Sequence, residues 1–559
     1  MIDAKIVKKG GFHDKEAIIF IKSRPGSKTA SKSCIFVPVM KQIPQAKHLT
    51  QTEVAERLHV STATVSNWVK EGLLEVDGGH RVTEESLRQF QKKHAGKTKL
   101  QNRANKLQKD GHDPAEVEAA VCHALEGGPF DEALGVRYQA MLSESFKNKE
   151  GIFYTPASIV DDMMKDLPMD ASTRFLDPCC GTGNFLVHAL QRGVLPEHLY
   201  GFDTDANAVR IAQRRIKELT GREAPHVVCA DFLEVASTLT ERFDLVFTNP
   251  PWGKKLPQPQ RMDYAQRYGA GSSTDTCSLF LLASLAVLRP NGMAGLLMPE
   301  SFFKIAVFED ARKAVLGKTL LQIKDYGKPF KNMYSAVALV IRQQDAEETN
   351  IVSCYYQQQI YPRPQVQFLE MPRCNINYWT RPEEMQRIET LLQQPYLTLK
   401  GHATWGLGIV TGNNAKMCKR SHRPGLKPVY RGKDIVPGRL KAAYYYINPN
   451  DFPRYQQLAP LSMYHAPEKL VYRFISSDLV FYCDTHQRYI LNSANMLVLD
   501  GDFPLKAKQL AQVMNSPLTN WLFKQLFHTH KVLKGDLEML PLFTDSTLHG
   551  GFNLLDFDR

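Results

Sequence analysis

Short apolar runs alternate with stretches of helical spacing between residues 157 and 345 of this 559-residue chain. The runs are RFL, LYGFD, HVVC, FDLVFT, GMAGLLM, LQIKD and AVALVIR. Short continuous apolar runs are typical of strands buried on both faces, and intervening helices favour a sheet with parallel strands. The pattern therefore predicts an α/β core built as a doubly wound, mixed sheet.

A different pattern precedes this region, where residues 50–70 have the spacing of two short helices around a turn. One face of each helix is apolar. The residues expected to face inward are Val54, Ala55 and Leu58 in the first helix and Val65, Trp68 and Val69 in the second. The next residues, EGLLEVDGGHRVTEESLRQFQKK, predict a hairpin at the Gly-Gly pair and then a third helix.

This arrangement resembles the winged helix-turn-helix of the excisionase and MerR type, whose second helix enters the major groove of DNA. The resemblance implies that Thr62, Thr64, Ser66 and Asn67 are exposed and read the bases. A helical hairpin that contacts another protein is the alternative interpretation of the same pattern.

The pattern becomes irregular after about residue 355, with β-like runs such as LVYRFIS and MLVLD and two helical pieces. A mixture of this kind predicts an α+β domain, and a chain of this length is too long for one hydrophobic core. The predicted segments are a basic β-like segment (1–47), a helix-turn-helix domain (48–95), a linker or helical region (96–133), an α/β domain (134–350) and a C-terminal α+β domain (351–559).

Basic residues are concentrated in two regions of the chain. The net charge is +12, and residues 1–109 hold 21 Lys and Arg against 10 Asp and Glu. Residues 400–441 hold ten basic residues and a single acid, Asp434. Two basic regions on either side of the α/β core favour nucleic acid as a partner, while a solvated surface is the alternative. The candidates for DNA contact in the second region are Arg420, Arg423, Arg431, Lys433 and Arg439.

The overall composition excludes several classes of protein. Hydrophobic residues make up 43% of the chain and its mean hydropathy is −0.32, which fits a soluble globular protein. No apolar run reaches the length of about 18 residues that a membrane span needs, so no membrane partner is expected. The first residues do not form a signal peptide, and the ten cysteines form no CxxC pair or zinc-ligand cluster. Free thiols in a reducing cytoplasm are expected, and no metal site.

The first predicted strand is followed by an acid and a glycine-containing turn, at the end of the strand where doubly wound sheets bind ligands. In DPCCGTGNF, Asp177 precedes Gly181 and Gly183 at the start of a helix. Glycines there let the backbone approach a ligand closely. This spacing suits a methionine-like zwitterion better than a pyrophosphate, which needs another spacing of glycines.

The next two strands also end in acids. LYGFD ends in Asp203, which is placed to bind ribose hydroxyls. CADF places Asp231 to accept a hydrogen bond from an adenine amino group, with Phe232 beside it to stack on the purine. Strand-end acids are ordinarily helix caps. Their occurrence in this order nevertheless predicts a nucleoside cofactor.

The fourth strand ends in Asn249-Pro250-Pro251-Trp252. Two prolines hold φ near about −65° and remove two backbone donors, so that carbonyls can face a pocket. Asn249 Oδ1 and the Pro250 carbonyl can each accept a hydrogen bond from one amino group, while Trp252 stacks on the ring that carries it. A simple turn is the alternative. The tetrapeptide predicts a pocket in which an amino group receives a methyl group.

The order GIFYTP, DPCCGTG, strand-end acid, ADF and NPPW resembles the gamma class of N6-adenine DNA methyltransferases, with the Taq-type and type IIG modification modules as the nearest pattern. The likeness covers about residues 134–545. It implies a Rossmann-like methyltransferase core followed by a target-recognition domain. It also implies S-adenosylmethionine as the cofactor, double-stranded DNA as the substrate and methylation of N6 of a flipped-out adenine.

The resemblance extends to single residues. Those that it places at the cofactor are Tyr154, Thr155, Pro156 and Cys179. It implies that Phe330, in the segment YGKPF, is a second aromatic residue that stacks on the base. Trp252 departs from the family pattern, in which Tyr or Phe is usual. Asn249 in place of Ser favours adenine N6 over cytosine N4 as the target.

Three alternatives stay open. They are an NPPY-type protein-glutamine methyltransferase, an RNA methyltransferase and a DNA-binding regulator with a relic methyltransferase core. The sequence lacks the Glu-x-Lys core of common nuclease sites, which predicts a methyltransferase without its own nuclease. The enzyme is then either solitary or the modification half of a restriction pair in a bacterial or archaeal cytoplasm, with a separate restriction endonuclease as its partner.

Overall fold

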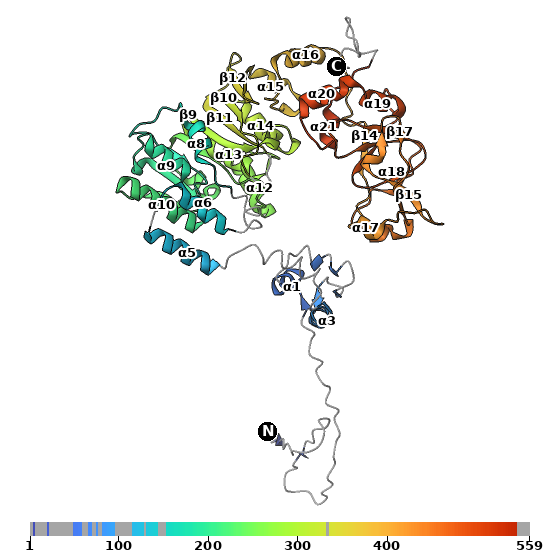
Figure 1. Cartoon of the computed structure of the whole chain (residues 1–559), viewed down its shortest axis with the longest axis horizontal. Coiled ribbons are helices and arrows are strands. Elements are labelled where there is room, and N and C mark those ends of the chain that lie inside the picture. Colours follow the sequence, from blue (N-terminus) through green and yellow to red (C-terminus); the bar gives the residue numbers. More distant parts are fainter. Residues whose placement is uncertain are drawn as a thin grey trace, which may run out of the picture. The chain divides into compact units, whose positions relative to one another are not determined.

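The computed structural model divides the chain into two compact units, Met1–Asp110 and Gly111–Arg559 (Figure 1). The residues that the structure describes are 4–5, 20–21, 48–58, 65–66, 68–69, 74–76, 81–94, 114–127, 130–142, 153–330 and 335–544. In the first unit, β1 (Ala4–Lys5) pairs with β2 (Phe20–Ile21) in antiparallel orientation.

A small apolar core joins the elements of the helix-turn-helix region. These elements are β3 (His48–Leu49), α1 (Gln51–Arg57), β4 (Val82–Thr83) and α3 (Glu84–His94). The core buries Val54, Ala55, Val65 and Trp68, with Leu58 and Val69 packed against them. The predicted inward faces of both helices are therefore confirmed.

The first helix begins at a capping box. The Glu53 N–H donates to Thr50 Oγ1 at 3.2 Å, and the Thr50 N–H donates to Glu53 Oε2 at 2.7 Å. The wing-like pairing of β3 with β4 is antiparallel. Of the four predicted base readers, Ser66 is partly exposed. Thr62, Thr64 and Asn67 lie outside the described residues.

A nine-stranded mixed sheet forms the centre of the second unit, in the order β13-β12-β10-β11-β9-β8-β5-β6-β7. Strands β5 to β9 are parallel to one another, whereas β11 is antiparallel to both of its neighbours. The strands are β5 (Phe175–Asp177), β6 (Leu199–Asp203), β7 (His226–Cys229), β8 (Phe243–Thr248), β9 (Leu288–Pro299), β10 (Lys318–Asp325), β11 (Ala336–Asp345), β12 (Ile351–Tyr356) and β13 (Gln359–Pro364).

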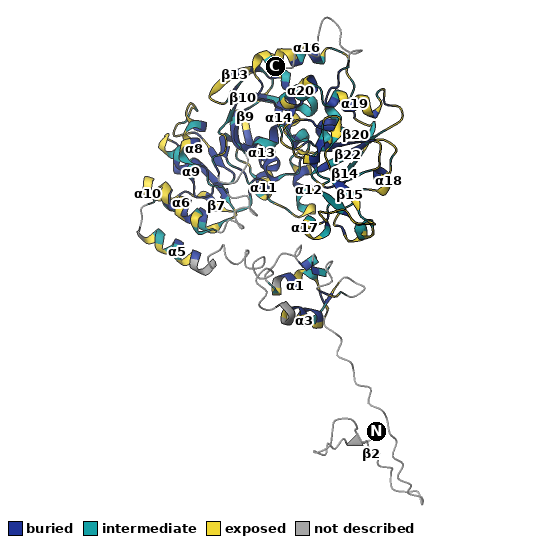
Figure 2. Ribbon diagram, turned by 45° about the vertical axis from the view of Figure 1, so that its right-hand side comes forward, coloured by how far each residue is buried: buried dark blue, intermediate teal, exposed yellow. Residues whose placement is uncertain are grey.

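Helices cover both faces of this sheet, whose strands are largely buried (Figure 2). The chain moves from β5 toward β7 in one direction and from β8 to β9 in the other. Because crossovers between parallel strands are right-handed, α9 and α10 lie on the face opposite α13. The helices are α5 (Pro114–Gly127), α6 (Glu132–Met141), α8 (Ala157–Met164), α9 (Asn184–Gln191), α10 (Ala206–Thr220), α11 (Phe232–Val235), α12 (Gln258–Arg267), α13 (Thr276–Val287) and α14 (Glu309–Leu316). The predicted doubly wound α/β core is confirmed.

The strand order creates a switch point between β5 and β8. Phe175 of β5 pairs with Leu245 of β8, and Leu176 pairs with Val246. The two strands are neighbours although β6, β7 and their helices separate them in sequence. Open α/β sheets bind ligands in the crevice at the carboxyl ends of the strands on either side of such a point. The turn after β5 and the tetrapeptide after β8 therefore meet at the same place.

The C-terminal part combines small sheets with helices, as the predicted α+β class requires. One sheet has the order β14-β22-β19-β20 and another the order β18-β15-β21. The strands are β14 (Ala403–Leu407), β15 (Lys427–Tyr430), β16 (Ile435–Val436), β17 (Arg439–Leu440), β18 (Tyr445–Ile447), β19 (Lys469–Arg473), β20 (Phe481–Asp484), β21 (Tyr489–Ile490) and β22 (Ala494–Leu499). The helices are α15 (Val366–Glu370), α16 (Pro382–Leu392), α17 (Asn414–Met417), α18 (Leu461–Tyr464), α19 (Ala507–Met514), α20 (Pro517–Phe527) and α21 (Lys534–Met539). Within the described part of the chain, no helix combines the length and apolar character that crossing a membrane requires.

Gly295 provides a test of the packing between β8 and β9. A Cβ atom at Gly295 would lie 2.1 Å from the ring of Phe247, which is fully buried. Gly295→Ala should therefore lower the free energy of unfolding by about 1–3 kcal/mol because the ring has to shift. Urea unfolding of the full-length protein measures this change.

Gly501→Ala is the matched control, since a Cβ atom there meets nothing within 4 Å. Its stability should stay within about 0.5 kcal/mol of the wild-type value. Equal stability of the two variants would contradict the packing described for Phe247.

Candidate active site

A hydrogen bond between two buried side chains joins the ends of β8 and β5. Thr248 Oγ1 donates to Asp177 Oδ1 over 2.7 Å. The same carboxylate oxygen accepts the backbone N–H of Cys179 at 3.2 Å. The two bonds hold the start of the glycine-containing turn against the residue that precedes Asn249.

The amide of Asn249 is held in a defined orientation. Its Nδ2 atom donates to the backbone carbonyl of Phe153 over 2.8 Å, and the residue lines the cavity at the ends of the strands. Because the nitrogen is used in this bond, Oδ1 is the atom that the amide can offer as an acceptor on its other side. The next turn of the loop is fixed from α13, where Thr276 Oγ1 donates to the Pro251 carbonyl at 2.8 Å.

Trp252 and Phe330, which were predicted to stack on the base, lie together in the structure. Their ring centroids are 5.6 Å apart and their planes meet at 76°, so that one ring faces the edge of the other. Phe153 completes a cluster of three rings, 5.5 Å from Phe330 and 6.5 Å from Trp252. Phe330 reaches this position because the loop between β10 and β11 lies at the same edge of the sheet as the end of β8.

The structure gives a physical reason for Trp at position 252. The indole Nε1 donates to the backbone carbonyl of Leu297 in β9 over 3.1 Å, and the ring is buried. Phe has no donor for this bond, and the Tyr hydroxyl lies at a different point of its ring. The bond fixes the plane of Trp252 relative to the sheet.

A cavity of about 670 Å³ opens at the carboxyl ends of β5 to β8. Pockets for small molecules have volumes of about 300–1,000 Å³, so a nucleoside cofactor fits. The predicted cofactor residues that line it are Tyr154, Thr155, Asp177, Cys179, Gly181, Asp203, Asp231 and Phe232, and Asn249 and Pro251 line it as well. The predicted residues outside its lining are Pro156, Gly183, Pro250, Trp252 and Phe330.

The glycine-containing turn has the backbone conformation that glycine permits. Gly181 has φ of 49° and Gly183 has φ of 87°, in the left-handed region. A Cβ atom at Gly181 would lie 2.6 Å from the ring of Tyr154. The turn therefore packs directly against the YTP segment, and Pro156 of that segment is the N-cap residue of α8.

A buried arginine is hydrogen-bonded to the glycine-containing turn. Arg215 of α10 donates from one guanidinium nitrogen to the Thr182 carbonyl at 2.6 Å and to Asn184 Oδ1 at 2.8 Å. Asn184 Nδ2 in turn donates to the Thr155 carbonyl at 2.8 Å. Arg215 was not among the predicted site residues, because no sequence motif distinguishes it from the other residues of α10.

Two acids of the cavity have raised pKa values. Burial raises the pKa of Asp177 to about 7 and that of Asp203 to about 6. Asp203 Oδ2 accepts the Gly181 N–H at 2.9 Å, and Oδ1 accepts the Asp205 N–H at 2.9 Å. Each oxygen retains a lone pair with which it can accept a further hydrogen bond. These carboxylates can accept hydrogen bonds and carry negative charge when ionised, so they suit a cationic nucleoside.

Asp231 and Phe232 differ in what they offer the cavity. Asp231 is the N-cap residue of α11, and its Oδ1 accepts the Leu233 N–H at 3.0 Å. Phe232 is 1% exposed, and its ring packs 5.8 Å from Phe202 and 5.9 Å from Phe280. Phe232 therefore contributes a packed wall and little open ring surface.

Sequence analysis missed residues on the two helices that precede the core. Tyr138 of α6 lines the cavity and donates to Asp205 Oδ2 at 2.6 Å, while Asp205 caps α10. Val117 of α5 also lines the cavity. In the sequence, the second acid of FDTD, Asp205, and the amphipathic spacing of residues 114–127 are the features that could have pointed to these residues. The cofactor cavity thus includes residues on the N-terminal side of residue 134.

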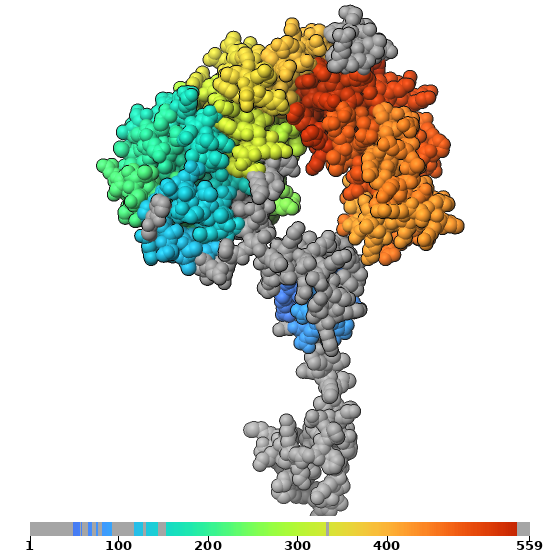
Figure 3. Space-filling model, in the orientation of Figure 1, coloured from blue at the N-terminus to red at the C-terminus, as the bar shows by residue number. Residues whose placement is uncertain are grey.

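The basic segment 400–441 reaches the molecular surface (orange in Figure 3). Three of the predicted DNA contacts surround the exposed ring of Tyr444, at 3.8 Å for Arg431, 5.5 Å for Arg420 and 5.9 Å for Lys433. The Arg431 guanidinium is also bound through two nitrogens to Asp434. Arg423 and Arg439 are exposed.

Comparisons with known proteins identify the family. The N-6 DNA Methylase family model matches residues 131–364 and the TaqI-like C-terminal specificity domain matches residues 427–542. A helix-turn-helix domain matches residues 49–95.

Individual proteins are also similar to the chain. The chain is 40% identical over 387 residues to type II methyltransferase M.VspI from Vibrio sp. (strain 343), which covers 69% of this chain and 95% of that protein. It is 24% identical over 190 residues to the type I restriction enzyme EcoEI methylase subunit from Escherichia coli, covering 31% of this chain and 36% of the subunit. Among solved structures, the type IIL restriction-modification enzyme MmeI in complex with DNA has a TM-score of 0.48 and 10% identity over 74% of this chain and 69% of that chain.

The chain belongs to the family of type II DNA methyltransferases that includes M.VspI, and it carries a helix-turn-helix domain at its N-terminal side. Its cofactor is S-adenosylmethionine and its macromolecular partner is DNA.

Cofactor binding should depend on pH in a defined direction. Because burial raises the pKa values of Asp177 and Asp203, these acids ionise only as the pH rises through about 6 to 7. Their ionised forms attract the sulfonium of S-adenosylmethionine, so its affinity should increase between about pH 5.5 and pH 7.5. Isothermal titration calorimetry of the full-length protein measures the dissociation constant at each pH.

S-adenosylhomocysteine is the matched control ligand, since it has the same amino acid part but no sulfonium charge. Its affinity should rise less over the same pH range. An identical pH dependence of both ligands would show that these carboxylates do not act on the sulfonium.

Proposed function

We propose that the chain methylates the exocyclic N6 amino group of adenine in double-stranded DNA. The observation that carries the proposal is the amide of Asn249, which lies at the edge of the cofactor cavity and is held by its bond to the Phe153 carbonyl. An amino nitrogen conjugated to a ring is a poor nucleophile. Hydrogen-bond acceptors and accurate positioning beside the methyl donor therefore supply much of the rate.

Two hydrogen-bond acceptors are available for the two hydrogens of the target nitrogen. Asn249 Oδ1 and the Pro250 carbonyl would hold its two hydrogens and favour a pyramidal nitrogen whose lone pair faces the methyl group. Pro250 and Pro251 restrict the backbone of the loop, and the bond from Thr276 to the Pro251 carbonyl supports it. Asn rather than Ser at this position favours adenine.

Trp252 and Phe330 are the proposed walls of the base site. A base stacked between parallel rings needs about 7 Å between them, because each stacking contact takes about 3.5 Å. The present edge-to-face contact at 5.6 Å leaves no such gap. Since the bond to Leu297 fixes Trp252, Phe330 is the ring that has to move when the base enters. Stacking of about 1–3 kcal/mol per base offsets part of the cost of flipping.

The proposed cofactor contacts follow the order of the strands. The turn with Gly181 and Gly183 takes the methionine part, with Asp177 and Cys179 beside it and Tyr154, Thr155 and Pro156 supporting the turn. Asp203 accepts hydrogen bonds from the ribose hydroxyls, and Asp231 accepts one from the adenine amino group. The packing of Phe232 between two other rings supports a role as the wall against the purine.

The proposed DNA contacts lie in two regions. In the C-terminal domain they are Arg420, Arg423, Arg431, Lys433 and Arg439, and in the helix-turn-helix domain they are Thr62, Thr64 and Asn67. The exposure of Arg420, Arg423, Lys433 and Arg439 supports the first set. Phosphate contacts of this kind give affinity and register, whereas base contacts give specificity.

We propose the same division into five segments, with α5 and the first two residues of α6 added to the catalytic domain because both helices line the cofactor cavity. The type II relationship supports a role in restriction and modification, with a separate restriction endonuclease as the partner enzyme.

Asn249→Ala should strongly slow methylation while cofactor binding persists. Loss of the amide acceptor should lower the rate of methyl transfer by about 10²–10³-fold, the scale of removing one preorganised polar group from a transition state. Incorporation of a labelled methyl group into DNA measures the rate, and calorimetry with S-adenosylhomocysteine checks that the cavity is intact. Normal turnover by this variant would rule out the proposed role.

Removal of surface charge in the C-terminal domain should weaken DNA binding in a salt-dependent manner. In Arg420→Ala and Lys433→Ala, the slope of log affinity against log salt should fall by about 1 for each lost phosphate contact. Fluorescence anisotropy with a labelled duplex measures the slope. Arg222→Ala is the control, because Arg222 pairs with Glu197 at the amino ends of β6 and β7, away from the active edge. An unchanged slope in both test variants would contradict these contacts.

A further inference from the structure

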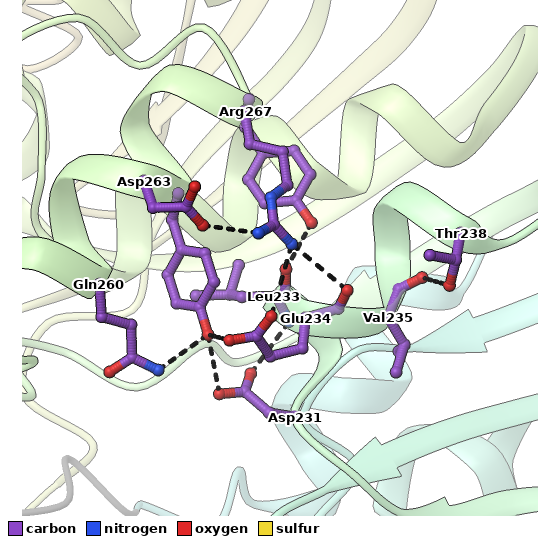
Figure 4. A network of polar contacts seen from close by, with 10 residues as sticks. Asp231, Leu233, Glu234, Val235, Thr238, Gln260, Asp263 and Arg267 are labelled. Atoms are coloured by element: carbon purple, nitrogen blue, oxygen red, sulfur yellow. Dashed lines mark hydrogen bonds and ion pairs between the residues drawn. The ribbon is translucent and has the colours of Figure 1, made fainter.

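A network of hydrogen bonds connects α12 with α11 beside the cavity (Figure 4). Tyr264 Oη donates to Glu234 Oε1 over 2.7 Å and lies 3.4 Å from Asp231 Oδ2. Gln260 Nε2 donates to the Tyr264 hydroxyl oxygen at 2.9 Å. A single hydroxyl therefore lies between a surface carboxylate and a carboxylate of the cofactor cavity.

The hydroxyl has only one proton to donate. Both carboxylates lie within hydrogen-bond distance of the hydroxyl, with Glu234 Oε1 at 2.7 Å and Asp231 Oδ2 at 3.4 Å, so the proton is shared between them. Tyr264 is fully buried, and burial together with Glu234 raises its pKa, so the hydroxyl stays protonated. Asp231 Oδ1 is already occupied by the Leu233 N–H. Asp231 Oδ2 has two lone pairs, so it can accept from Tyr264 and also accept a hydrogen bond from a ligand in the cavity.

The helix that carries Tyr264 also continues from the catalytic loop. α12 begins at Gln258 and is joined to Trp252 through residues 253–257. The same helix therefore contacts an acid of the cofactor cavity at one point and follows the tetrapeptide at another. Tyr264 is the residue of this helix that reaches Asp231.

We propose that Tyr264 is a positioning residue that holds the Asp231 carboxylate in the orientation that accepts the adenine amino group of S-adenosylmethionine. This inference rests on the proposed role of Asp231. Without the hydroxyl, the two carboxylates lose the polar group that lies between them, and Asp231 is free to turn away from the cavity. The residue acts on the cofactor through Asp231 and not by contact.

A purely structural clamp between the helices is the competing explanation, and a neighbouring residue represents it. Tyr268 Oη donates to the Leu233 carbonyl over 2.5 Å, also from α12 to α11. Tyr264→Phe and Tyr268→Phe each remove one hydroxyl from the contact between α12 and the start of α11. Only the first change affects a carboxylate of the cavity.

The experiment compares two ligands that differ at the adenine amino group. These are S-adenosylhomocysteine and S-inosylhomocysteine, in which an oxo group replaces the 6-amino group. Dissociation constants are measured by calorimetry on the full-length wild-type protein and both variants. The wild-type protein and Tyr268→Phe should prefer the adenosyl ligand by about tenfold, the scale of a hydrogen bond to a charged group. In Tyr264→Phe this preference should fall to about twofold or less.

Two results would overturn the inference. One is a full preference for the adenosyl ligand in Tyr264→Phe, and the other is an equal loss of preference in both variants. Absence of any preference in the wild-type protein would instead refute the assignment of Asp231, and the inference would fall with it. Failure of methylation at adenine would leave the ligand preference intact, so the two proposals are separable.

A second pair of variants on exposed residues guards against misfolding of Tyr264→Phe. In Glu234→Ala the Tyr264 proton has Asp231 Oδ2 as its remaining acceptor, so Asp231 stays oriented and the preference for the adenosyl ligand should be retained. Asp263→Ala breaks only the pair with Arg267 on the surface of α12 and should retain the preference. Loss of the preference in Glu234→Ala, with retention in Asp263→Ala, would overturn the inference.

Discussion

The pairing of β5 with β8, closed by the hydrogen bond from Thr248 to Asp177, is the constraint on which the rest of the site depends. It places a turn that suits a cofactor beside a loop that suits an amino group, although many residues separate them in the chain. The bond is made between buried groups, where its loss would leave a desolvated carboxylate with the Cys179 N–H as its remaining hydrogen-bond partner. The cavity opens at the ends of these two paired strands, and Asn249 directly follows β8 in the chain, with α12 as the next helix.

The charged groups of the site and its aromatic rings lie on different sides of it. Carboxylates with raised pKa values line the cofactor side, where a cationic ligand compensates for their burial. Uncharged groups form the other side, namely the amide of Asn249 and the rings of Trp252, Phe153 and Phe330. A neutral acceptor and apolar rings suit a neutral base. On the cofactor side, Tyr264 of α12 contacts Asp231.

The sequence predicted the sheet, the three strand-end acids and the tetrapeptide, because each lies at a point where a strand ends and the motif is local. It could not predict Arg215, Tyr138 or Tyr264, since a helix gives no signal for which side chain reaches back to a turn. It also predicted Trp252 and Phe330 as a pair, but their edge-to-face contact depends on packing against β9 that no local pattern contains. The bond from Trp252 to the Leu297 carbonyl, which explains Trp at this position, depends on the same packing against β9.

The central claim is that the amino group of adenine is the target, and identification of the modified nucleoside tests it most directly. Unmethylated bacterial DNA is incubated with the full-length protein and S-adenosylmethionine, digested to nucleosides and analysed by liquid chromatography and mass spectrometry. The structure-based account predicts N6-methyldeoxyadenosine as the product, with no change in the cytosine derivatives. A product methylated at cytosine N4 or C5, with deoxyadenosine unmodified, would contradict it.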